Sequence, residues 1–396
     1  MGTITKNKYY QLEQIWDTAI KVNGSVALWK SPRETTKNLL IDLSPGVLDS
    51  TTKIESSEIG FMVSPFLNRS GKKTLFLKAD ALFTSTDNKK WELLAGKNRS
   101  FIYNELKKNS LKNIPSTYHT KFEDGDEISN DKKHFIDLVN KSVRSIKRNQ
   151  FEKVIIARTL NKSLDPKFDI LTIFDRLSSI HQDAFVSLIS IPSQGTWIGA
   201  TPELLTEFSE KHFRTVSVAG TQKFPNEKDL SDAAWTQKEI REQAMVSRYI
   251  VNQFKKIRLR EYVETGPHSV RAGNMIHLKS EFTVDLEKKY FPDLGAIMKN
   301  LLHPTSAVCG MPKLNALQFI TNNEHLDREL YSGYLGPVNM NGVSKLYVNL
   351  RCMQLFNQCA KLYAGAGITF DSIPEKEWDE TTLKCHTLLD VMDLGN

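Results

Sequence analysis

Two pairs of glutamates, each three residues apart, fall in segments whose apolar residues repeat at helical spacing. Glu239 and Glu242 lie in a long central segment, and Glu377 and Glu380 lie in the last expected helix. Spacing i, i+3 places both members of a pair on one helix face. If the two helices face each other, four carboxylates converge in a way that suits Mg²⁺, a hard cation that prefers oxygen ligands. Each pair taken alone is more often a solvated helix face.

A lysine and a glutamate at strand ends are candidates for acid–base chemistry. Lys153 opens the apolar segment 153–158, and Glu203 follows Pro202 at the start of another apolar strand. Apolar surroundings lower the pKa of a lysine and raise the pKa of a carboxyl group. Lys153 could therefore act as a base and Glu203 as an acid near neutral pH. The alternatives are a lysine that points into solvent and a carboxylate that accepts nearby backbone N–H groups.

Three polar residues alternate along segment 345–355, which predicts a strand. Tyr347, Asn349 and Arg351 would then share one face of that strand. Arginine binds carboxylates through two parallel hydrogen bonds, so this face is a candidate site for an organic acid. Lys384 extends the face of the last glutamate pair by one helical turn and adds a second cation.

Glycines in two segments allow backbone N–H groups to approach an anion closely. These segments are Gly220-Thr221 and Gly365-Ala366-Gly367. The second segment lacks the third glycine and the following helix of a dinucleotide-binding fingerprint. The sequence also lacks a Walker-type loop, a Gly-x-Ser-x-Gly elbow and a His-Glu-x-x-His motif.

The composition indicates a globular protein without a nucleic-acid or membrane partner. The chain has 396 residues, of which 40% are hydrophobic and 25% charged, and this suits one large composite domain or two to three domains. The formal net charge is +7, but the lysine pairs are scattered and no basic stripe interleaved with aromatics occurs. The N-terminus shows no targeting signal and no apolar run approaches the length of a membrane span, so we expect a cytoplasmic protein.

Long helices separated by runs of several strands predict an α+β fold with largely antiparallel sheets. Helices are expected from about residue 132, over about 231–257 and over about 375–392. Strands are expected at 153–158, 184–191, 196–200, 204–208, 213–218, 345–355 and 360–369, the last two as a hairpin. The polar stretch 110–133 is a candidate linker or exposed loop.

Taken together and in order, these segments resemble the chorismate-utilising enzymes, which include the isochorismate, salicylate, anthranilate and aminodeoxychorismate synthases. The resemblance covers roughly residues 130–394. It is carried by Phe151-Glu152-Lys153-Val154-Ile155, Thr201-Pro202-Glu203-Leu204-Leu205, Val218-Ala219-Gly220-Thr221, Lys238-Glu239-x-x-Glu242, His303-Pro304-Thr305-Ser306-Ala307-Val308-Cys309-Gly310, Asp327-Arg328, Arg351-Cys352, Gly365-Ala366-Gly367-Ile368 and Glu377-x-x-Glu380-Thr381. So many ordered matches outweigh the solvated-face interpretation of the glutamates.

The resemblance implies one large composite domain of mainly antiparallel sheets with helices packed outside. Residues 130–396 would form the chorismate-binding catalytic region, and residues 1–110, which match poorly, would complete the sheets. Lys153 would be the base and Glu203 the acid. The implied Mg²⁺ ligands are Glu242 and Glu380 directly, with Glu239 and Glu377 close by or through water. The implied substrate-binding residues are Gly220, Thr221, His303, Tyr347, Arg351, Gly365, Gly367 and Lys384.

Three positions discriminate among the reactions of the family. Lys153 is typical of members that activate water, whereas anthranilate synthases, which use ammonia, typically carry glutamine there. Ala219 stands where aminodeoxychorismate synthases typically carry a lysine nucleophile. The segment His303-Pro304-Thr305 is similar to that of isochorismate synthases. The resemblance therefore favours conversion of chorismate to isochorismate, which feeds menaquinone, siderophores or salicylate, over a salicylate synthase that goes on to eliminate pyruvate.

Two hypotheses from other classes stay open. A catalytically inactive binding protein could keep the fold, although retention of Lys153, Glu203 and both glutamate pairs disfavours it. A nucleic-acid binder is suggested by net charge alone.

The sequence departs from the family at Gln243, where histidine is usual. Glutamine can donate hydrogen bonds but cannot carry charge near the metal. Family members of this kind are often monomeric, so we expect a monomer.

Overall fold

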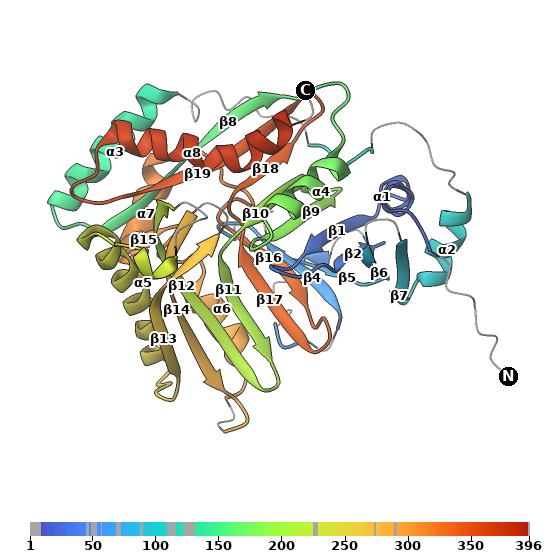
Figure 1. Ribbon diagram of the computed structural model, residues 1–396, viewed down its shortest axis with the longest axis horizontal. Coiled ribbons are helices and arrows are strands. Elements are labelled where there is room, and N and C mark those ends of the chain that lie inside the picture. The colour runs from blue at the N-terminus through green and yellow to red at the C-terminus, as the bar shows by residue number, and fades with distance from the viewer. Residues whose placement is uncertain are drawn as a thin grey trace.

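Two antiparallel sheets pack face to face, and helices cover their outer faces (Figure 1). The computed structural model describes residues 9–44, 47–48, 54–56, 58–68, 73–87, 90–108, 116–121, 131–224, 229–272, 275–288 and 291–394. Most of the stretch 110–133, the candidate linker, lies outside these residues. The predicted α+β fold with mainly antiparallel sheets is confirmed.

One sheet has ten strands and combines residues from both halves of the chain. Its order is β15 (Gly310–Met311), β8 (Lys153–Ser163), β19 (Cys359–Ile368), β18 (Cys352–Leu355), β10 (Gly195–Thr201), β9 (Phe185–Ile191), β1 (Ser25–Lys30), β2 (Lys37–Asp42), β6 (Ala81–Asp87) and β7 (Lys90–Ala95). Helices α1 (Leu12–Lys21), α4 (Ile170–Ile180) and α8 (Pro374–Asp393) pack on its outer face, and α3 (Lys132–Lys147) lies beside α8 (Figure 1). Helix α2 (Arg99–Lys108) contacts α1.

The second sheet has nine strands and is also built from both halves of the chain. Its order is β13 (Val263–Ala272), β14 (Met275–Asp285), β12 (His212–Lys223), β11 (Leu204–Ser209), β17 (Val343–Val348), β16 (Tyr334–Val338), β4 (Gly60–Ser64), β5 (Leu75–Lys78) and β3 (Val47–Leu48). Helix α5 (Gln237–Lys256) packs on β12 and β14, and α6 (Leu294–Leu302) packs on β11. Helix α7 (Lys313–Asn323) instead contacts β8 and β15 of the first sheet.

The layers follow from which side of each strand is apolar. In β1, Val26 and Leu28 belong to the apolar layer under the helices, whereas Ala27 and Trp29 belong to the layer between the two sheets. Successive side chains of a strand point to opposite faces, so a strand in the middle of such a sandwich must be apolar on both. All six residues of β1 are accordingly buried.

Aromatic pairs join the two sheets. The rings of Phe185 in β9 and Tyr347 in β17 stack with centroids 4.1 Å apart and planes at 6°. Trp29 in β1 and Phe61 in β4 lie 5.2 Å apart. Because each pair takes one residue from each sheet, these contacts fix the spacing of the sandwich.

Segment 345–355, predicted as one strand, forms two strands in different sheets. Strand β17 ends at Val348 in the nine-stranded sheet, and β18 begins at Cys352 in the ten-stranded sheet. Between them Arg351 has a φ of +47°, in the left-handed region that does not continue a strand. Strand β18 then forms the predicted hairpin with β19.

This break makes the predicted alternation of Tyr347, Asn349 and Arg351 on one strand face wrong. Tyr347 lies between the sheets against Phe185. Asn349 is buried, and its side-chain amide donates to the carbonyl of Leu330 at 2.9 Å. The two-residue period holds only within one strand, and this chain changes sheet at 349–351.

The helix predicted over 231–257 begins at Gln237. Thr236 and Glu239 form a capping box at its start, and Leu230–Asp232 form a separate 3₁₀ turn before it. A capping box satisfies N–H groups that the first helical turn leaves without partners, so it sets where the helix starts.

Within the described part of the chain, no helix is both long and apolar enough to cross a membrane.

Replacing Phe185 with alanine should lower the free energy of unfolding by about 3–5 kcal/mol, because it empties space between the two sheets. Urea denaturation followed by far-UV circular dichroism measures the change. Phe370→Ala is the matched control, since Phe370 is 61% exposed, and it should change stability by less than about 0.5 kcal/mol. Equal losses in the two variants would contradict the role given to the aromatic pairs.

Candidate active site

Lys153 is the first residue of β8, and its side chain is buried against the neighbouring strand β19. Gly367 of β19 pairs with Ile155, and the side chain of Lys153 reaches over it. A β-carbon on Gly367 would lie 2.9 Å from Cε and 3.4 Å from Nζ of Lys153. A larger residue at position 367 would therefore displace the ammonium group. This glycine makes room for the predicted base.

Two segments that cross from one sheet to the other bind each other. One joins β10 to β11 and contains Glu203, and the other joins β17 to β18 and contains Arg351. The N–H of Val348 donates to the carbonyl of Glu203 at 3.0 Å, and the N–H of Ala200 donates to the carbonyl of Arg351 at 3.1 Å. The Thr201 hydroxyl donates to the carbonyl of Val348 at 2.6 Å. These bonds hold Glu203 and Arg351 next to each other.

The carboxyl group of Glu203 can exchange a proton near neutral pH. Burial raises its pKa to about 7, although Thr305, Arg351 and Lys153 each act in the opposite direction. The hydroxyl of Thr305 lies 3.5 Å from Oε1 of Glu203. Lys153 is close enough to influence the pKa of Glu203, so the two predicted catalytic residues lie near each other. A pKa near the working pH is what general acid catalysis requires.

Cations gather on the side of the site formed by α8. Lys384 donates to the carbonyl of Gly365 at 2.7 Å and to Oε1 of Glu380 at 2.6 Å. Burial lowers the pKa of Lys384, with Glu380 opposing the shift and Arg351 and Lys153 adding to it. Burial also lowers the pKa of Arg351. Arg351 and Lys384 thus form one positively charged group that suits an organic anion.

The four predicted metal ligands are in different states. On α8, burial raises the pKa of Glu377, and the like charge of Glu380 adds to the effect. On α5, Glu239 accepts hydrogen bonds from the N–H and the hydroxyl of Thr236 at 2.7 and 2.5 Å, so its carboxylate caps the helix. Glu242 is partly exposed, and among the described residues no hydrogen bond or ion pair engages its carboxylate.

Helices α5 and α8 approach each other at the site. The charge of Lys238 on α5 opposes the effect of burial on the pKa values of Glu377 and Glu380 on α8. Across the residues that the structure describes, however, no group of three or more His, Cys, Asp or Glu side chains is placed to hold a metal ion. The expected convergence of all four carboxylates is not present.

Gly220 brings β12 close to the start of α5. It sits in a bulge between Ala219 and Thr221, with a φ of +66° that glycine adopts without strain. A β-carbon on Gly220 would lie 2.9 Å from the β-carbon of Glu239. Thr221 continues the strand opposite His277, but its side chain lies outside the described atoms.

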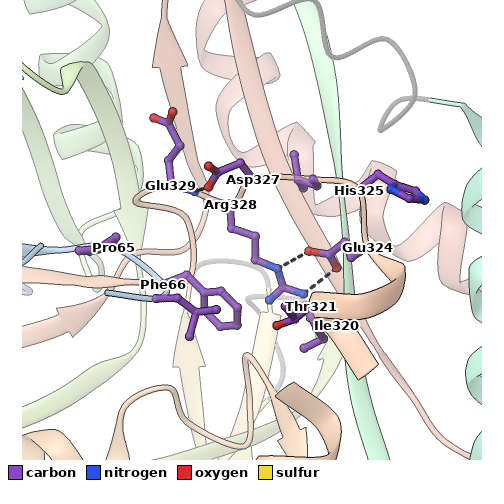
Figure 2. A pocket seen from close by; sticks show the side chains of 11 residues that line it. Pro65, Phe66, Ile320, Thr321, Glu324, His325, Asp327, Arg328 and Glu329 are labelled. Atoms are coloured by element: carbon purple, nitrogen blue, oxygen red, sulfur yellow. Dashed lines mark hydrogen bonds and ion pairs between the residues drawn. The ribbon is translucent and has the colours of Figure 1, made fainter. Parts of the chain in front are cut away.

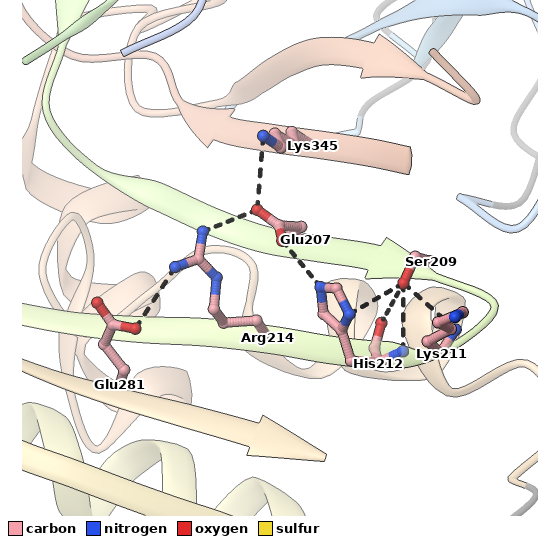
Figure 3. Close-up of polar contacts among 7 residues, drawn as sticks. All are labelled: Glu207, Ser209, Lys211, His212, Arg214, Glu281 and Lys345. Atoms are coloured by element: carbon pink, nitrogen blue, oxygen red, sulfur yellow. Dashed lines mark hydrogen bonds and ion pairs between the residues drawn. The ribbon is translucent and has the colours of Figure 1, made fainter. Parts of the chain in front are cut away.

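Tyr347 lies in the packing layer between the sheets. Besides its stacking on Phe185, burial raises the pKa of its hydroxyl, with Glu207 as the next cause. Glu207 is the centre of a polar network on the nine-stranded sheet, where it accepts hydrogen bonds from His212 at 3.0 Å and Arg214 at 2.8 Å (Figure 3). The contacts of Tyr347 in this structure are therefore those of a core residue.

His303 anchors a loop, and a neighbour in that loop reaches the site. Its Nε2–H donates to the carbonyl of Phe66 at 3.1 Å, and its ring packs edge-on against Tyr334. Burial lowers the pKa of His303 to about 3, so the ring is neutral. Thr305, two residues further on, is the one that contacts Glu203.

Gln243, at the usual histidine position, faces the sheet behind α5. It is 2% exposed, and its Nε2 donates to the hydroxyls of Ser217 at 2.7 Å and Ser280 at 3.1 Å. The amide thus bonds to β12 and β14. Gln243 would affect a bound metal by holding α5 in place and not by contacting the metal ligands.

Two residues near the site were not among those predicted. Thr305 was seen only as part of a discriminating segment. The hydroxyl of Tyr331 would lie 2.8 Å from a β-carbon on Gly365. Burial lowers the pKa of Arg351, and Tyr331 opposes this shift. In the sequence, Tyr331 is marked only by its position three residues after the Asp327-Arg328 motif. That position does not reveal that the loop packs against β19.

Comparisons with known proteins agree with the motifs. Residues 45–393 match the family described as chorismate binding enzyme. Isochorismate synthase EntC of Escherichia coli (strain K12) is 29% identical over 250 residues, which cover 62% of this chain and 63% of EntC. Anthranilate synthase component 1 of Methanothermobacter thermautotrophicus is 24% identical over 313 residues, covering 74% of this chain and 65% of the relative.

The fold agrees as well. The solved structure of MenF, the menaquinone-specific isochorismate synthase from Escherichia coli, superimposes with a TM-score of 0.75 over 98% of this chain and 94% of MenF, at 20% sequence identity. The aligned region spans less than two thirds of the length of EntC and of the anthranilate synthase. The family match includes Lys153, Glu203 and both glutamate pairs. The chain therefore belongs to the chorismate-binding enzymes.

Proposed function

We propose that this chain is an isochorismate synthase, an isomerase that adds water at C2 of chorismate and removes the hydroxyl group at C4. One observation carries the proposal: Glu203 has a pKa of about 7 and lies within electrostatic reach of the buried Lys153. The reaction needs one proton taken and one given, and groups in different environments can divide these tasks. EntC, an isochorismate synthase, is among the relatives that support it.

The two residues would act on opposite faces of the substrate ring. Neutral Lys153 takes a proton from a water molecule as the water oxygen bonds to C2. The ring double bonds shift, the C4–O bond breaks, and protonated Glu203 gives its proton to the departing hydroxide. One water enters and one leaves, and exchange with solvent returns both side chains to their starting protonation states.

Binding of the substrate would use the positive group described above. Chorismate carries two carboxylates at neutral pH, and Arg351 can bind one of them through two hydrogen bonds. Lys384 supplies the second cation. The backbone at Gly220 and Gly367 carries no β-carbon that would keep a carboxylate away. From the resemblance to the family, we also propose that the enzyme acts as a monomer and that it is located in the cytoplasm.

The residues fit Mg²⁺, which proteins usually bind through one or two carboxylates together with waters and substrate oxygens. Glu242 and Glu380 would hold the ion, and Glu377 would lie close by. Burial raises the pKa of Glu377, and the like charge of Glu380, which a cation would offset, adds to the shift. Glu239, engaged in the capping box, would act through water. When bound, the ion would attach the ring carboxylate of chorismate and neutralise it.

Incubation of the purified protein with chorismate and Mg²⁺ should yield isochorismate, detected by liquid chromatography and mass spectrometry. Lys153→Ala should reduce turnover at least about 10³-fold, since it removes the base, and should remain folded. Salicylate and free pyruvate would show that the enzyme is a salicylate synthase instead. Anthranilate formed with ammonium would place it with the ammonia-using members.

The pKa of Glu203 predicts a loss of activity at alkaline pH. Because the acid must be protonated, the active fraction of Glu203 falls about tenfold per pH unit above about 7, and kcat/KM should follow it over the pH range in which the base Lys153 is already neutral. Glu203→Gln should be inactive at every pH.

Stability provides an independent check of the Glu203 pKa. The folded-state pKa lies above the ordinary 4.5, so the carboxyl group stabilises the fold at pH below 4.5, and this contribution is lost as pH rises through about 7. Between pH 4.5 and 8 the Tm of the wild type should therefore fall further than that of Glu203→Gln. If the Tm values of the two proteins change in parallel with pH, the pKa of Glu203 is not raised in the folded state.

Glu380→Gln should weaken Mg²⁺ binding at least about tenfold, because it removes a charged ligand. Isothermal titration calorimetry with Mg²⁺ measures this without turnover, and activity against Mg²⁺ concentration should shift in parallel. Glu375→Gln, an exposed change on the same helix, is the control and should bind normally. Wild-type activity that survives EDTA would refute the metal assignment.

A further inference from the structure

The two edges of strand β8, which begins with Lys153, pair with neighbouring strands over very different lengths. Along one edge it pairs with β19 from Val154 to Ser163. Along the other edge it pairs with the two-residue strand β15 at Lys153 and Val154 only. The N–H of Ile155 then donates to the carbonyl of Cys309 at 2.9 Å. The next backbone groups on this edge are the carbonyl of Ile155 and the N–H of Ala157.

Two charged side chains take the place of the missing strand. The guanidinium of Arg328 donates through one terminal nitrogen to the carbonyl of Ile155 at 2.8 Å. The carboxylate of Glu324 accepts the N–H of Ala157 at 2.9 Å. Arg328 and Glu324 also bind each other through two bonds of 2.6 and 2.7 Å (Figure 2). The pair therefore completes the hydrogen bonding of β8 as a strand would.

Arg328 connects this strand to the loop that contacts the acid. Its other terminal nitrogen donates to the carbonyl of Val308 at 2.8 Å. Val308 belongs to the loop that contains Thr305, and Thr305 contacts Glu203. The guanidinium also lies over the ring of Phe66, 4.4 Å from its centroid. One side chain is thus bonded to the strand of the base and to the loop beside the acid.

The burial of this pair indicates a role beyond packing. Arg328 is 3% and Glu324 9% exposed. Buried ion pairs lose much of their attraction to desolvation, so apolar residues of similar volume often give equal stability. Apolar side chains, however, could not bond to Ile155, Ala157 and Val308, and these three bonds determine where β8 and the loop lie.

We propose that the Glu324–Arg328 pair is a positioning element of the reaction, which sets the distance between the base Lys153 and the acid Glu203. The inference rests on the proposed function. Lys153 is two residues from Ile155, so a shift of the β8 edge moves the base. A misplacement of about 1 Å at a reacting centre can cost about 10²-fold in rate. Substrate binding by Arg351 and Lys384, on other elements, would change little.

The test uses two conservative variants of the full chain, Arg328→Lys and Glu324→Asp. Each keeps its charge but loses the two-bond geometry, and Glu324→Asp provides the measurement if Arg328→Lys does not fold. We expect kcat to fall about 10- to 100-fold while KM stays within about threefold. Hydrogen exchange at the amide of Ala157 should become faster in both variants.

Asp175→Asn is the matched control. Asp175 and Lys37 form an ion pair of 2.6 Å in which the Lys37 side chain is 7% exposed. Lys37 lies in β2, six strands from β8 in the same sheet. This variant should keep the wild-type kcat even if its Tm falls.

A normal kcat in folded Arg328→Lys and Glu324→Asp would overturn the inference. So would a loss explained by unfolding alone, seen as recovery of kcat when the assay is cooled well below the Tm. If the wild type makes no isochorismate, the proposed function fails on its own. The kcat and KM of the variants for the product that the wild type does form would then still test the pair.

Discussion

The central constraint in this molecule is that inner strands of both sheets, such as β1 and β4, are buried on both faces. A charged side chain inside such a strand is costly unless it is paired and hydrogen-bonded, as Glu207 is in β11. Lys153 lies at the start of β8, and Glu203 and Arg351 lie in the two crossing segments. The crossings bind each other through backbone hydrogen bonds. The predicted base Lys153, the predicted acid Glu203 and the cation Arg351 therefore lie together at a strand start and at the crossings between sheets.

The charges within the site also depend on one another. Lys384 bonds to Glu380, Arg351 acts on both, and Glu203 keeps a pKa of about 7 against the opposing charges of Arg351 and Lys153. Burial is the largest single influence on Glu203, and it outweighs these cations. Burial therefore causes most of the shift in the pKa of Glu203. A change that admits water to the site would lower this pKa even if every direct contact were kept.

Much of the fold could be read from the sequence, because helical and strand periodicities report burial directly. The α+β class and the ordered motifs from β8 to α8 were predicted correctly. The split of segment 345–355 could not be predicted, since alternation looks the same whether a strand continues or passes into a second sheet. The convergence of four glutamates was also overestimated. Spacing gives the face of a helix, but it does not reveal that Glu239 caps its own helix.

The pairing of β8 with β19 has a consequence for biosynthesis. Ile155 lies opposite Gly367, so the strand that pairs with the longer edge of β8 is made about 200 residues after the strand that carries Lys153. During translation the longer edge of β8 stays unpaired, and its apolar residues are exposed to other nascent chains. Contacts this distant in sequence form slowly. A cell that makes this protein quickly therefore benefits from chaperones that shield the early strands until β19 leaves the ribosome.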